Sequence, residues 1–399
     1  MILLIKLTGI IVLIIVMLQK KVKLGYAMLM AAFALAVIFN IGISSVIDIT
    51  IDTIIDKDTI NIVVLLVLII TLEKVMSHKQ LMSRMVLSLK NIIGDYKIAS
   101  LILPAIIGIL PSAGGAIFSA PMIAEVCSGV IVENENKSFI NYWYRHVWEF
   151  VFPIYTGIIL ASAILNVEIG KLIGLFYPYT ILSIIVGIPI AFYYFPKSAS
   201  SRPQEVNKNL KIFMFNSYPI ILILILFFVF KINIVITTLL TLVSLIIAEK
   251  INISEFWSIY KKDNSFNTII TVISIIYFKN MLIESKAIED LLLVFNSAGI
   301  SNVYIALFLP LIIGILTGMA SAVVGITFPV VMNLGGGIDF NLITLAYVSG
   351  SAGVMMSPMH LCFTLTTEFF KADFNRVWMR VAIGQIFILL CGLTAYLYF

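Results

Sequence analysis

The octapeptide LPAIIGIL at residues 103–110 returns as LPLIIGIL at residues 309–316, with seven identities in eight positions. Each copy runs directly into small or helix-terminating residues, PSAGG at 111–115 and TGMAS at 317–321. A shared proline and glycine at the same place in two distant segments indicate an internal repeat. The alternative explanation is composition, because Ile- and Leu-rich segments resemble each other by chance.

The apolar segments that contain the two copies, residues 98–128 and 303–334, are each about 31 residues long. A helix crosses the hydrocarbon core of a bilayer with about 20 residues, so each segment is too long for one straight crossing and too short for two. We therefore predict two re-entrant hairpins whose tips stop near the middle of a membrane. That geometry is tolerated only where the tip is buried in protein or lines a wet cavity.

The composition of the 399 residues, 61% hydrophobic and only 12% charged with a mean hydropathy of +1.09, predicts a membrane protein. A soluble domain carries about 25% charged residues. The net charge of +5 does not indicate nucleic-acid binding, because the Lys and Arg residues lie in short loops between apolar runs. Besides the hairpins we predict ten transmembrane helices, at residues 2–18, 26–46, 59–76, 139–165, 172–195, 212–230, 232–249, 265–283, 342–370 and 377–398.

The basic residues also predict the orientation of the chain, because cytoplasmic loops of membrane proteins hold the Lys and Arg. If both hairpins return to the side they entered from, nineteen basic residues lie inside and six outside, with the N- and C-termini outside the cell membrane. The acidic segment 48–58 then becomes an outside loop. The first apolar run lacks a basic n-region and a cleavage site, so we predict that it is a retained helix.

The repeat extends beyond the octapeptides. Their prolines lie 206 residues apart, and Pro153 and Pro358, each inside the span that follows a hairpin, lie 205 apart. We therefore predict an all-α polytopic membrane protein with two halves, residues 1–195 and 212–399, joined by a cytoplasmic linker at 196–211. Each half holds five crossings and one hairpin, and because five is odd the second half is inverted relative to the first.

The two predicted tips bring hydroxyls and free backbone groups to the bilayer centre, where such groups are costly unless something satisfies them. The helix that follows each tip presents unpaired N–H donors and a partial positive charge, which suits a carboxylate or another anion. The carbonyls that end the preceding helix could hold Na⁺, and we predict no other cofactor and no metal centre. Close packing through small residues is the alternative. The candidate binding residues of the tips are Pro111, Ser112, Ala113, Gly114, Gly115, Thr317, Gly318, Met319, Ala320 and Ser321.

A second pair of helix breaks is predicted at Pro153 and Pro358, because a proline inside a helix frees a carbonyl one turn earlier. Ahead of Pro153, Arg145 and Glu149 are spaced i,i+4 and are able to pair, with His146 between them. These residues are either a structural ion pair near the cytoplasmic end of the span or a device for coupling or gating.

Ser357 and His360 flank Pro358 in the second half and are further candidates for the binding site. A histidine beside a helix break either hydrogen-bonds a neighbouring carbonyl as a structural residue, or binds substrate or relays protons.

Three other features carry weaker signals. Residues 77–92 and 284–297 are polar enough to be short amphipathic helices at the membrane surface that link each hairpin to the rest of the chain, or ordinary connecting loops. The cysteines, Cys127, Cys362 and Cys391, lie in apolar surroundings without CxxC spacing and say nothing about redox compartment.

The runs GILPSAGGAIFSAP at 108–121, YRHVWEFVFPIY at 144–155 and SPMHLCFTLTTEFF at 357–370 resemble a prokaryotic membrane family, domain of unknown function 401. The resemblance covers nearly the full chain. It implies a place in the ion transporter superfamily, with its carriers for citrate, gluconate and dicarboxylates, and a fold with a scaffold part and a hairpin-bearing transport part. Well-studied dicarboxylate members carry Ser-Asn-Thr at both tips, which this chain lacks, so only the location of the site is implied.

We expect a secondary transporter of a small solute, most simply an organic anion such as a carboxylate, working by alternating access with Na⁺ or H⁺ coupling. A Na⁺/H⁺ antiporter of the same fold is the alternative, although no central Asp pair is present. The sequence has no HExxH motif, so an intramembrane enzyme is not expected. It has no phosphate-binding GxxxxGK[ST] loop either, so ATP-driven transport is not expected. A non-transporting scaffold is a further alternative. The expected partners are the substrate, the bilayer and, by analogy with the superfamily, a second copy of the chain.

Overall fold

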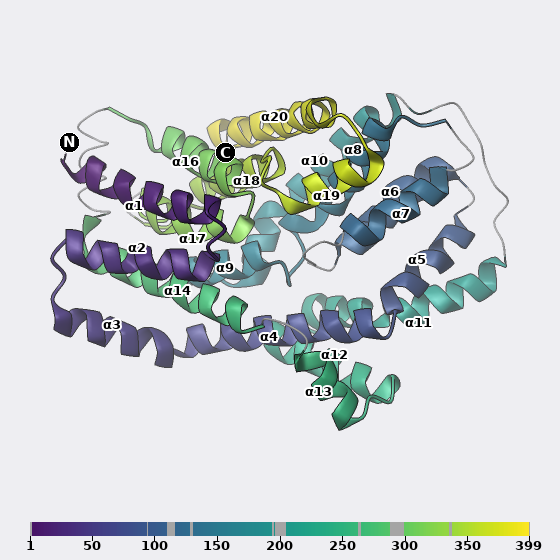
Figure 1. Ribbon diagram of the computed structural model, residues 1–399, viewed down its shortest axis with the longest axis horizontal. Helices are drawn as coiled ribbons and strands as arrows, with labels where there is room; N and C mark the ends of the chain where they lie inside the picture. The colour runs from purple at the N-terminus through teal and green to yellow at the C-terminus, as the bar shows by residue number, and fades with distance from the viewer. Residues whose placement is uncertain are drawn as a thin grey trace.

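A computed structural model describes residues 2–93, 95–109, 116–127, 131–193, 195, 205–261, 265–287, 299–334 and 337–398. All regular secondary structure in these residues is helical (Figure 1). The first half holds α1 Ile2–Gln19, α2 Leu24–Ile38, α3 Ile43–Ile55, α4 Lys57–His78, α5 Leu81–Ile92, α6 Tyr96–Gly108, α7 Ala116–Val126, α8 Asn134–Arg145, the 3-10 turn η2 Val147–Phe150, α9 Thr156–Leu165 and α10 Ile169–Tyr193. The second half holds α11 Val206–Leu224, the π-helical turn η3 Ile225–Val229, α12 Ile234–Ala248, α13 Ile253–Lys261, α14 Ser265–Glu284, α16 Asn302–Thr317, α17 Ala320–Val331, α18 Phe340–Met355, α19 Leu361–Phe370 and α20 Phe374–Tyr398.

The outer surface of the helices is strongly apolar. Phe33 on α2, Ile185 on α10 and Ile383 on α20 each expose more than half of their surface. Four of the described helical segments, α4, α10, α11 with η3, and α20, are long and apolar enough to cross a membrane by length and composition. Many helices expose apolar side chains, and such a surface is stable in lipid but not in water. The outer surface is therefore consistent with a membrane protein.

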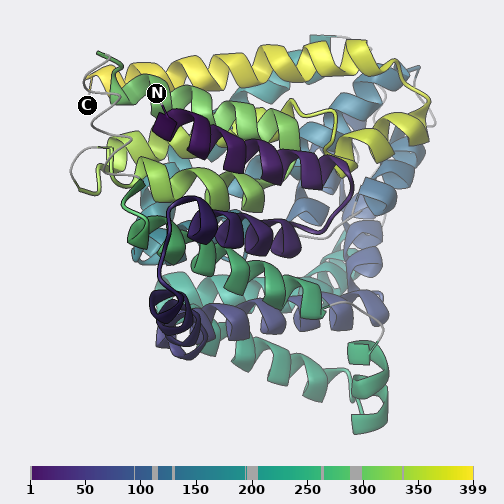
Figure 2. The same ribbon diagram turned by 60° about the vertical axis from the view of Figure 1, so that its left-hand side comes forward.

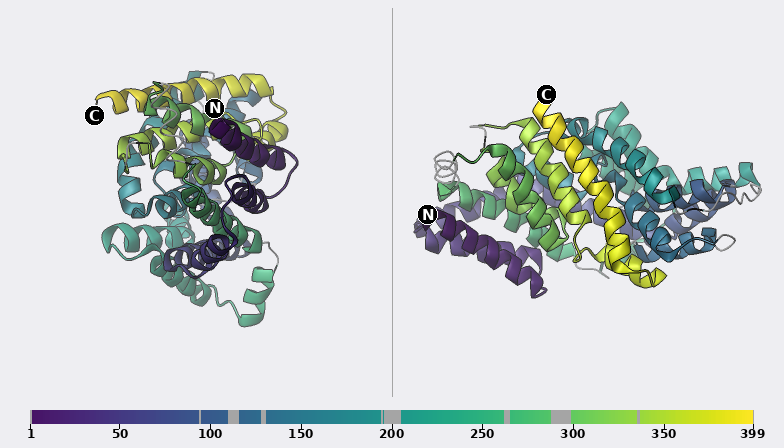
Figure 3. Two further views of the ribbon diagram at one scale, coloured as in Figure 1. Left: turned by 90° about the vertical axis from the view of Figure 1, so that its left-hand side faces the viewer. Right: turned by 90° about the horizontal axis from the view of Figure 1, so that it is seen from above.

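The helices form two layers (Figure 1). We call α6–α10 with α16–α20 the interrupted layer, because breaks separate α8 from α9 and α18 from α19, and α2–α5 with α11–α14 the continuous layer. The layers meet where α14 contacts α17 and α9 and where α4 contacts α9, while α1 packs on α2 and α16. The separation is visible from the side in Figure 3, left, with α20 at the top and α13 at the bottom. Both chain ends lie on one side of the molecule and α13 on the other (Figure 2).

The two halves contribute corresponding helices to each layer. α2 packs on α14 as α12 packs on α4; α6 packs on α8 as α16 packs on α18; and α9 packs on α17 as α19 packs on α7. The non-glycine residues with positive φ also recur some 205 to 210 residues apart, in the pairs Lys21 and Lys231, Asn40 and Lys250, Gln80 and Lys286, and Asn166 and Lys371. Because a left-handed residue ends a helix or turns the chain, the halves change direction at matching places.

The glycine of each repeated octapeptide lies where two helices touch. A Cβ at Gly108 on α6 would overlap the Arg145 carbonyl at the end of α8, and a Cβ at Gly314 on α16 would lie 2.6 Å from the Gly350 carbonyl oxygen of α18. Only glycine lets the backbones approach so closely. The repeated glycine therefore allows α6 to pack closely against α8, and α16 against α18.

The helices α16 and α17 form a hairpin in space. The Asn302 side chain at the start of α16 donates to the Leu334 carbonyl, just beyond α17, at 2.5 Å, so the two ends of the segment lie together. The chain reverses at Gly318, which has a φ of +64°, and Met319. In the other predicted hairpin α6 and α7 pack against each other, and the tip at 111–115 lies outside the described residues.

Several predicted boundaries need correction. The span predicted at 26–46 ends at Ile38, because the chain turns at Asn40, and the acidic segment predicted as a loop at 48–58 is helical, in α3 and the start of α4. The linker predicted to extend to residue 211 ends earlier, since α11 begins at Val206.

Other predictions of helix ends are confirmed. The spans at 139–165 and 342–370 are interrupted around Pro153 and Pro358, between α8 and α9 and between α18 and α19. The amphipathic segment 77–92 contains the short helix α5, whereas most of its counterpart at 284–297 lies outside the described residues.

Candidate functional site

A cavity of about 560 Å³ lies where the α16–α17 reversal faces the break between α8 and α9. It gathers most of the residues proposed from sequence for the second tip and the two helix breaks, together with two lysines from the turn between α1 and α2. The polar and tip residues that line it are Lys21, Lys23, Arg145, His146, Glu149, Tyr155, Thr156, Thr317, Gly318, Met319, Ala320, Ser321, His360 and Cys362.

The carbonyls that the first break frees are satisfied by hydroxyls from other helices. Thr180 Oγ1 donates to the Val147 carbonyl at 2.9 Å, and the Tyr347 hydroxyl donates to the Glu149 carbonyl at 3.0 Å. The Tyr155 hydroxyl donates to the Gly108 carbonyl at the end of α6. An unpaired carbonyl in an apolar interior costs several kcal/mol, so these donors make the break stable.

The second break is held in the same way. The Tyr142 hydroxyl donates to the Met355 carbonyl at 3.0 Å, and Trp378 Nε1 donates to the Met356 carbonyl at 2.8 Å. Both donors come from other helices, α8 and α20. The unwound backbone is therefore a fixed part of the fold.

The two histidines of the candidate site meet in the cavity. Nε2 of His360 lies 3.1 Å from Nε2 of His146. Nδ1 of His360 lies 2.8 Å from the Gly318 carbonyl oxygen, and Nδ1 of His146 lies 2.6 Å from the Tyr142 carbonyl oxygen. Since a carbonyl oxygen only accepts, each Nδ1 carries the proton in these contacts, and a ring that is neutral then presents its lone pair at Nε2.

Cys362 completes this cluster. Its Sγ accepts a hydrogen bond from Arg145 at 2.9 Å, and the ligand atoms of His146, His360 and Cys362 all lie within 4.8 Å of one another. Cys362 was not predicted as a site residue, because its surroundings in the sequence are apolar. The His-Leu-Cys spacing at 360–362 was the available signal, since it places two ligating side chains at the start of one helix.

The predicted pairing of Arg145 and Glu149 rested on a continuous helix, and that premise is wrong. α8 ends at Arg145, and Glu149 lies in the 3-10 turn η2, so the i,i+4 spacing no longer stacks the two side chains on one helical face. Arg145 is buried and donates to Cys362, while Glu149 also lines the cavity.

The other candidate residues lie elsewhere. Ser357 is fully buried, donates to the Ile315 carbonyl at 2.6 Å and accepts from the Met359 amide at 3.1 Å, so it joins the second break to α16. The tip residues 111–115 lie outside the described residues.

Comparison with known protein families identifies the family of the chain. The family model described as protein of unknown function (DUF401) matches residues 2–398. The chain belongs to the DUF401 family. No curated protein matches it.

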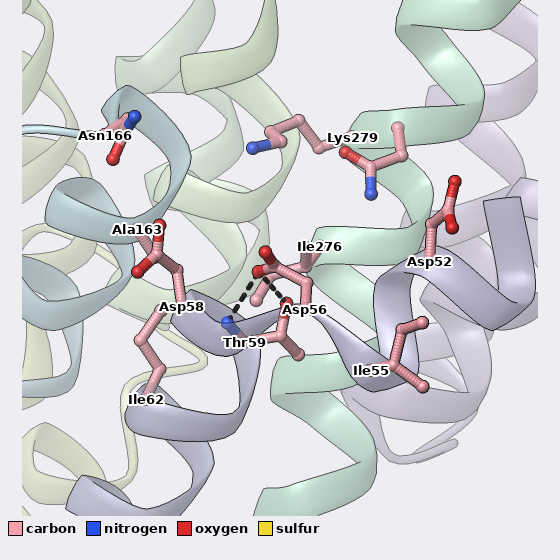
Figure 4. A pocket seen from close by; sticks show the side chains of 11 residues that line it. Asp52, Ile55, Asp56, Asp58, Thr59, Ile62, Ala163, Asn166, Ile276 and Lys279 are labelled. Carbon is pink, nitrogen blue, oxygen red and sulfur yellow. Dashed lines mark hydrogen bonds between the residues drawn. The ribbon is translucent and has the colours of Figure 1, made fainter.

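This DUF401 protein has a second polar hollow, of about 460 Å³, where α3, α4, α9 and α14 meet (Figure 4). Three carboxylates, Asp52, Asp56 and Asp58, line it together with Lys279 and Asn166. Asp56 caps α4, because its side chain accepts from the amide of the helix's third residue at 2.8 Å.

The sequence analysis did not find this hollow, because it treated 48–58 as a solvated loop. The spacing of four between Asp48, Asp52 and Asp56 was the available signal, since it places carboxylates along one face of a helix. The acidic residues thus lie on and between two helices and not in an irregular loop.

Helix α9 reaches both the cavity and the hollow of the DUF401 protein. Thr156 and Gly157 at its start line the cavity, whereas Ala163 and Asn166 near its end line the hollow. At 1.5 Å per residue a helix of this length spans about 15 Å. Leu160 in the middle of α9 is fully buried, and the cavity and the hollow share no lining residue.

Proposed function

We propose that this protein is a secondary transporter that moves a small organic anion, such as a carboxylate, across a membrane by alternating access. The observation that carries the proposal is a cavity of about 560 Å³, built at the break between α16 and α17 and lined by cationic side chains, inside an apolar helical protein. Its volume lies within the roughly 300 to 1,000 Å³ of small-molecule sites. Discontinuous helices around a polar cavity are a recurrent design of secondary transporters.

The charges of the cavity favour an anion. Arg145, Lys21 and Lys23 outnumber the single carboxylate of Glu149. Two helix N-termini also reach the cavity, those of α9 at Thr156 and α17 at Ala320. Free N–H groups and the partial positive charge of a helix N-terminus bind carboxylates, so they add to the attraction of the basic side chains.

The arrangement of helices supports two inverted repeats of five crossings and one re-entrant hairpin. Corresponding helices pair across the halves, and both halves contribute to each layer. In the proposed mechanism the interrupted layer carries the substrate and moves against the continuous layer, as implied by the resemblance to the ion transporter superfamily. The cavity and the hollow then mark the routes to the two sides of the membrane.

The proposed orientation follows from the basic loops. Lys21 and Lys23 line the cavity and belong to a loop placed inside by its charge, so the cavity opens to the cytoplasm, with both termini outside a plasma membrane. Na⁺ or H⁺ supplies the driving force. The acidic hollow beside α3 then faces outward.

Uptake by proteoliposomes tests this proposal. Vesicles containing the protein are expected to accumulate a labelled mono-, di- or tricarboxylate or a sugar acid faster than empty vesicles. The transported compound should also raise the melting temperature of the purified protein, because a ligand of the folded state stabilises it. Failure of every anion in both assays would refute the proposal.

A matched pair of variants locates the site. Ser321→Ala removes a hydroxyl from the cavity, and losing one hydrogen bond of about 0.5 to 1.5 kcal/mol raises KM roughly 2- to 10-fold. Ser244→Ala in α12 removes a hydroxyl that donates to Thr241 of its own helix. It should leave KM unchanged.

Exchange of Na⁺ for H⁺ is the second candidate, and Glu149 in the cavity is the observation that favours it. A buried carboxylate is the usual proton carrier in such antiporters. Collapse of a pH gradient on adding Na⁺ to proteoliposomes, without any anion, would support the antiporter. A requirement for the anion would support the carrier.

A further inference from the structure

We propose that His146, His360 and Cys362 bind one transition-metal ion of the zinc class at the wall of the cavity, with an open coordination position facing the substrate. This goes beyond the anion carrier and rests on it only for the role of the open position. No metal site was predicted from the sequence, because His146 lies more than 200 residues from His360 and Cys362 and meets them only in the fold.

The geometry of the three ligand atoms suits a single ion. Two nitrogens 3.1 Å apart, each about 2.0 to 2.1 Å from a zinc ion, subtend an angle of about 100° at the metal, close to tetrahedral. The Cys362 sulfur lies within 4.8 Å of both nitrogens. A small shift of side chains brings it to the Zn–S distance of about 2.3 Å. Imidazole and thiolate ligands are the set that zinc and its neighbours prefer.

The surroundings fix both histidines in the form that binds metal. The Gly318 and Tyr142 carbonyls hold the proton on Nδ1 of His360 and His146, which leaves Nε2 free to ligate. Such outer hydrogen bonds are the usual support of metal-binding histidines. Two lone pairs that face each other at 3.1 Å repel unless a cation or a proton lies between them. A metal ion removes that repulsion.

The charge of the ion would add to the attraction of the cavity for an anion. The Cys362 thiolate balances Arg145, which hydrogen-bonds it. A divalent ion then adds positive charge beside Glu149, on a wall that already carries lysines. Three protein ligands leave a fourth position of a tetrahedral ion open, as in catalytic zinc sites, and a carboxylate oxygen of the anion would fill it.

Cobalt titration tests the site in the full-length protein. Purified protein, stripped with a chelator, is titrated with Co²⁺ and followed by visible and near-ultraviolet absorption. We expect one ion per chain, with the intense visible bands of tetrahedral Co²⁺ and a thiolate-to-cobalt charge-transfer band, both lost when Zn²⁺ is added. A wild-type protein that binds neither ion would overturn the inference, and a proton shared by the histidines would then explain their contact.

The chain provides matched controls, since it has only three histidines and three cysteines. Cys362→Ser should abolish the charge-transfer band, while Cys391→Ser on α20 retains it. His360→Ala should weaken binding by more than the roughly 10- to 100-fold that the loss of an outer-shell partner costs, while His78→Ala, outside the cavity, has no effect. Equal spectra for Cys362→Ser and Cys391→Ser would refute the site.

The metal site and the transport function are tested by separate measurements. Cobalt binding is measured without a membrane, and anion uptake is measured with and without a chelator. Uptake by a protein that binds no cobalt would refute the metal site alone. Cobalt bound at the expected ligands in a protein that takes up no anion would refute the carrier and leave the metal site standing.

Discussion

The two layers of the molecule differ in whether helix breaks are held open by donors from other elements. In the continuous layer, several hydroxyls bond within their own helix: Thr71 donates to the Val67 carbonyl and Thr238 to the Ile234 carbonyl, each one turn earlier. In the interrupted layer, some hydroxyls also bond within their own helix, but others reach carbonyls at the helix breaks from another element, as Tyr347 does to the Glu149 carbonyl. A hydroxyl that bonds within its own helix needs no other element. A hydroxyl from another element satisfies the carbonyls that a broken helix leaves unpaired, and so stabilises the break. Polar groups become available to a solute only in the second case.

The largest expected effect disrupts the interrupted layer at a close contact between two helix backbones. A Cβ at Gly314 would lie 2.6 Å from the Gly350 carbonyl oxygen, and helix backbone has no room to retreat. Gly314→Ala should cost about 3 kcal/mol of folding stability, measured as a lower melting temperature. Gly174→Ala in α10, where a Cβ meets nothing within 4 Å, is the control and should be neutral or stabilising by up to about 1 kcal/mol. Equal melting temperatures would contradict the close approach.

A cross-link tests whether the layers move against each other. A Cβ at Gly325 on α17 would lie 3.0 Å from Ile275 Cγ1 on α14, across the contact between layers. Oxidising the Ile275→Cys, Gly325→Cys pair should stop uptake, and a reductant should restore it. Val348→Cys with Gly392→Cys, whose Cβ positions are 3.7 Å apart within the interrupted layer, should transport in both states. Transport by the oxidised first pair would rule out relative movement there.

The charge of the cavity is tested by Arg145→Ala. A hydrogen bond to a charged group contributes about 1.5 to 3 kcal/mol, so its loss should raise the Kd of the transported anion roughly 10- to 150-fold. Arg84→Ala, which changes an exposed arginine of α5 in the continuous layer, should leave Kd unchanged. Thermal-shift titration of both variants provides the measurement. An unchanged Kd in Arg145→Ala would show that the anion binds elsewhere.

The smallest effect concerns an exposed contact of the continuous layer. Glu255 on α13 pairs with Lys79 at 2.8 Å, and that hydrogen bond lowers the pKa of the Glu255 carboxyl. A lowered pKa means that the pair stabilises α13 docking above the ordinary pKa of glutamate, and that this contribution is lost as the pH falls through the lowered value. Lys79→Ala should therefore speed hydrogen exchange in α13 slightly at neutral pH. It should make no difference below the lowered pKa, and an equal effect at both pH values would contradict the pairing.

Periodicity, prolines and glycines predicted much of the fold. The breaks near Pro153 and Pro358 follow from the missing amide of proline, and the reversal at Gly318 follows from a residue that adopts positive φ without strain. The acidic helix α3 was not predicted, because its many carboxylates indicated a loop at the membrane surface. The spacing of four between its aspartates would have indicated a helix. The pairing of Arg145 with Glu149 was assumed on a helix that ends at Arg145.

The sequence by itself determined the apolar, helical character of the chain and the places where helices break, because hydropathy, proline and glycine act locally along the backbone. Only the tertiary structure decided that His146, His360 and Cys362 meet, since they come from two spans more than 200 residues apart. It likewise decided which cations surround the cavity. Contacts between distant segments depend on how whole helices pack, and no local pattern of residues encodes that register.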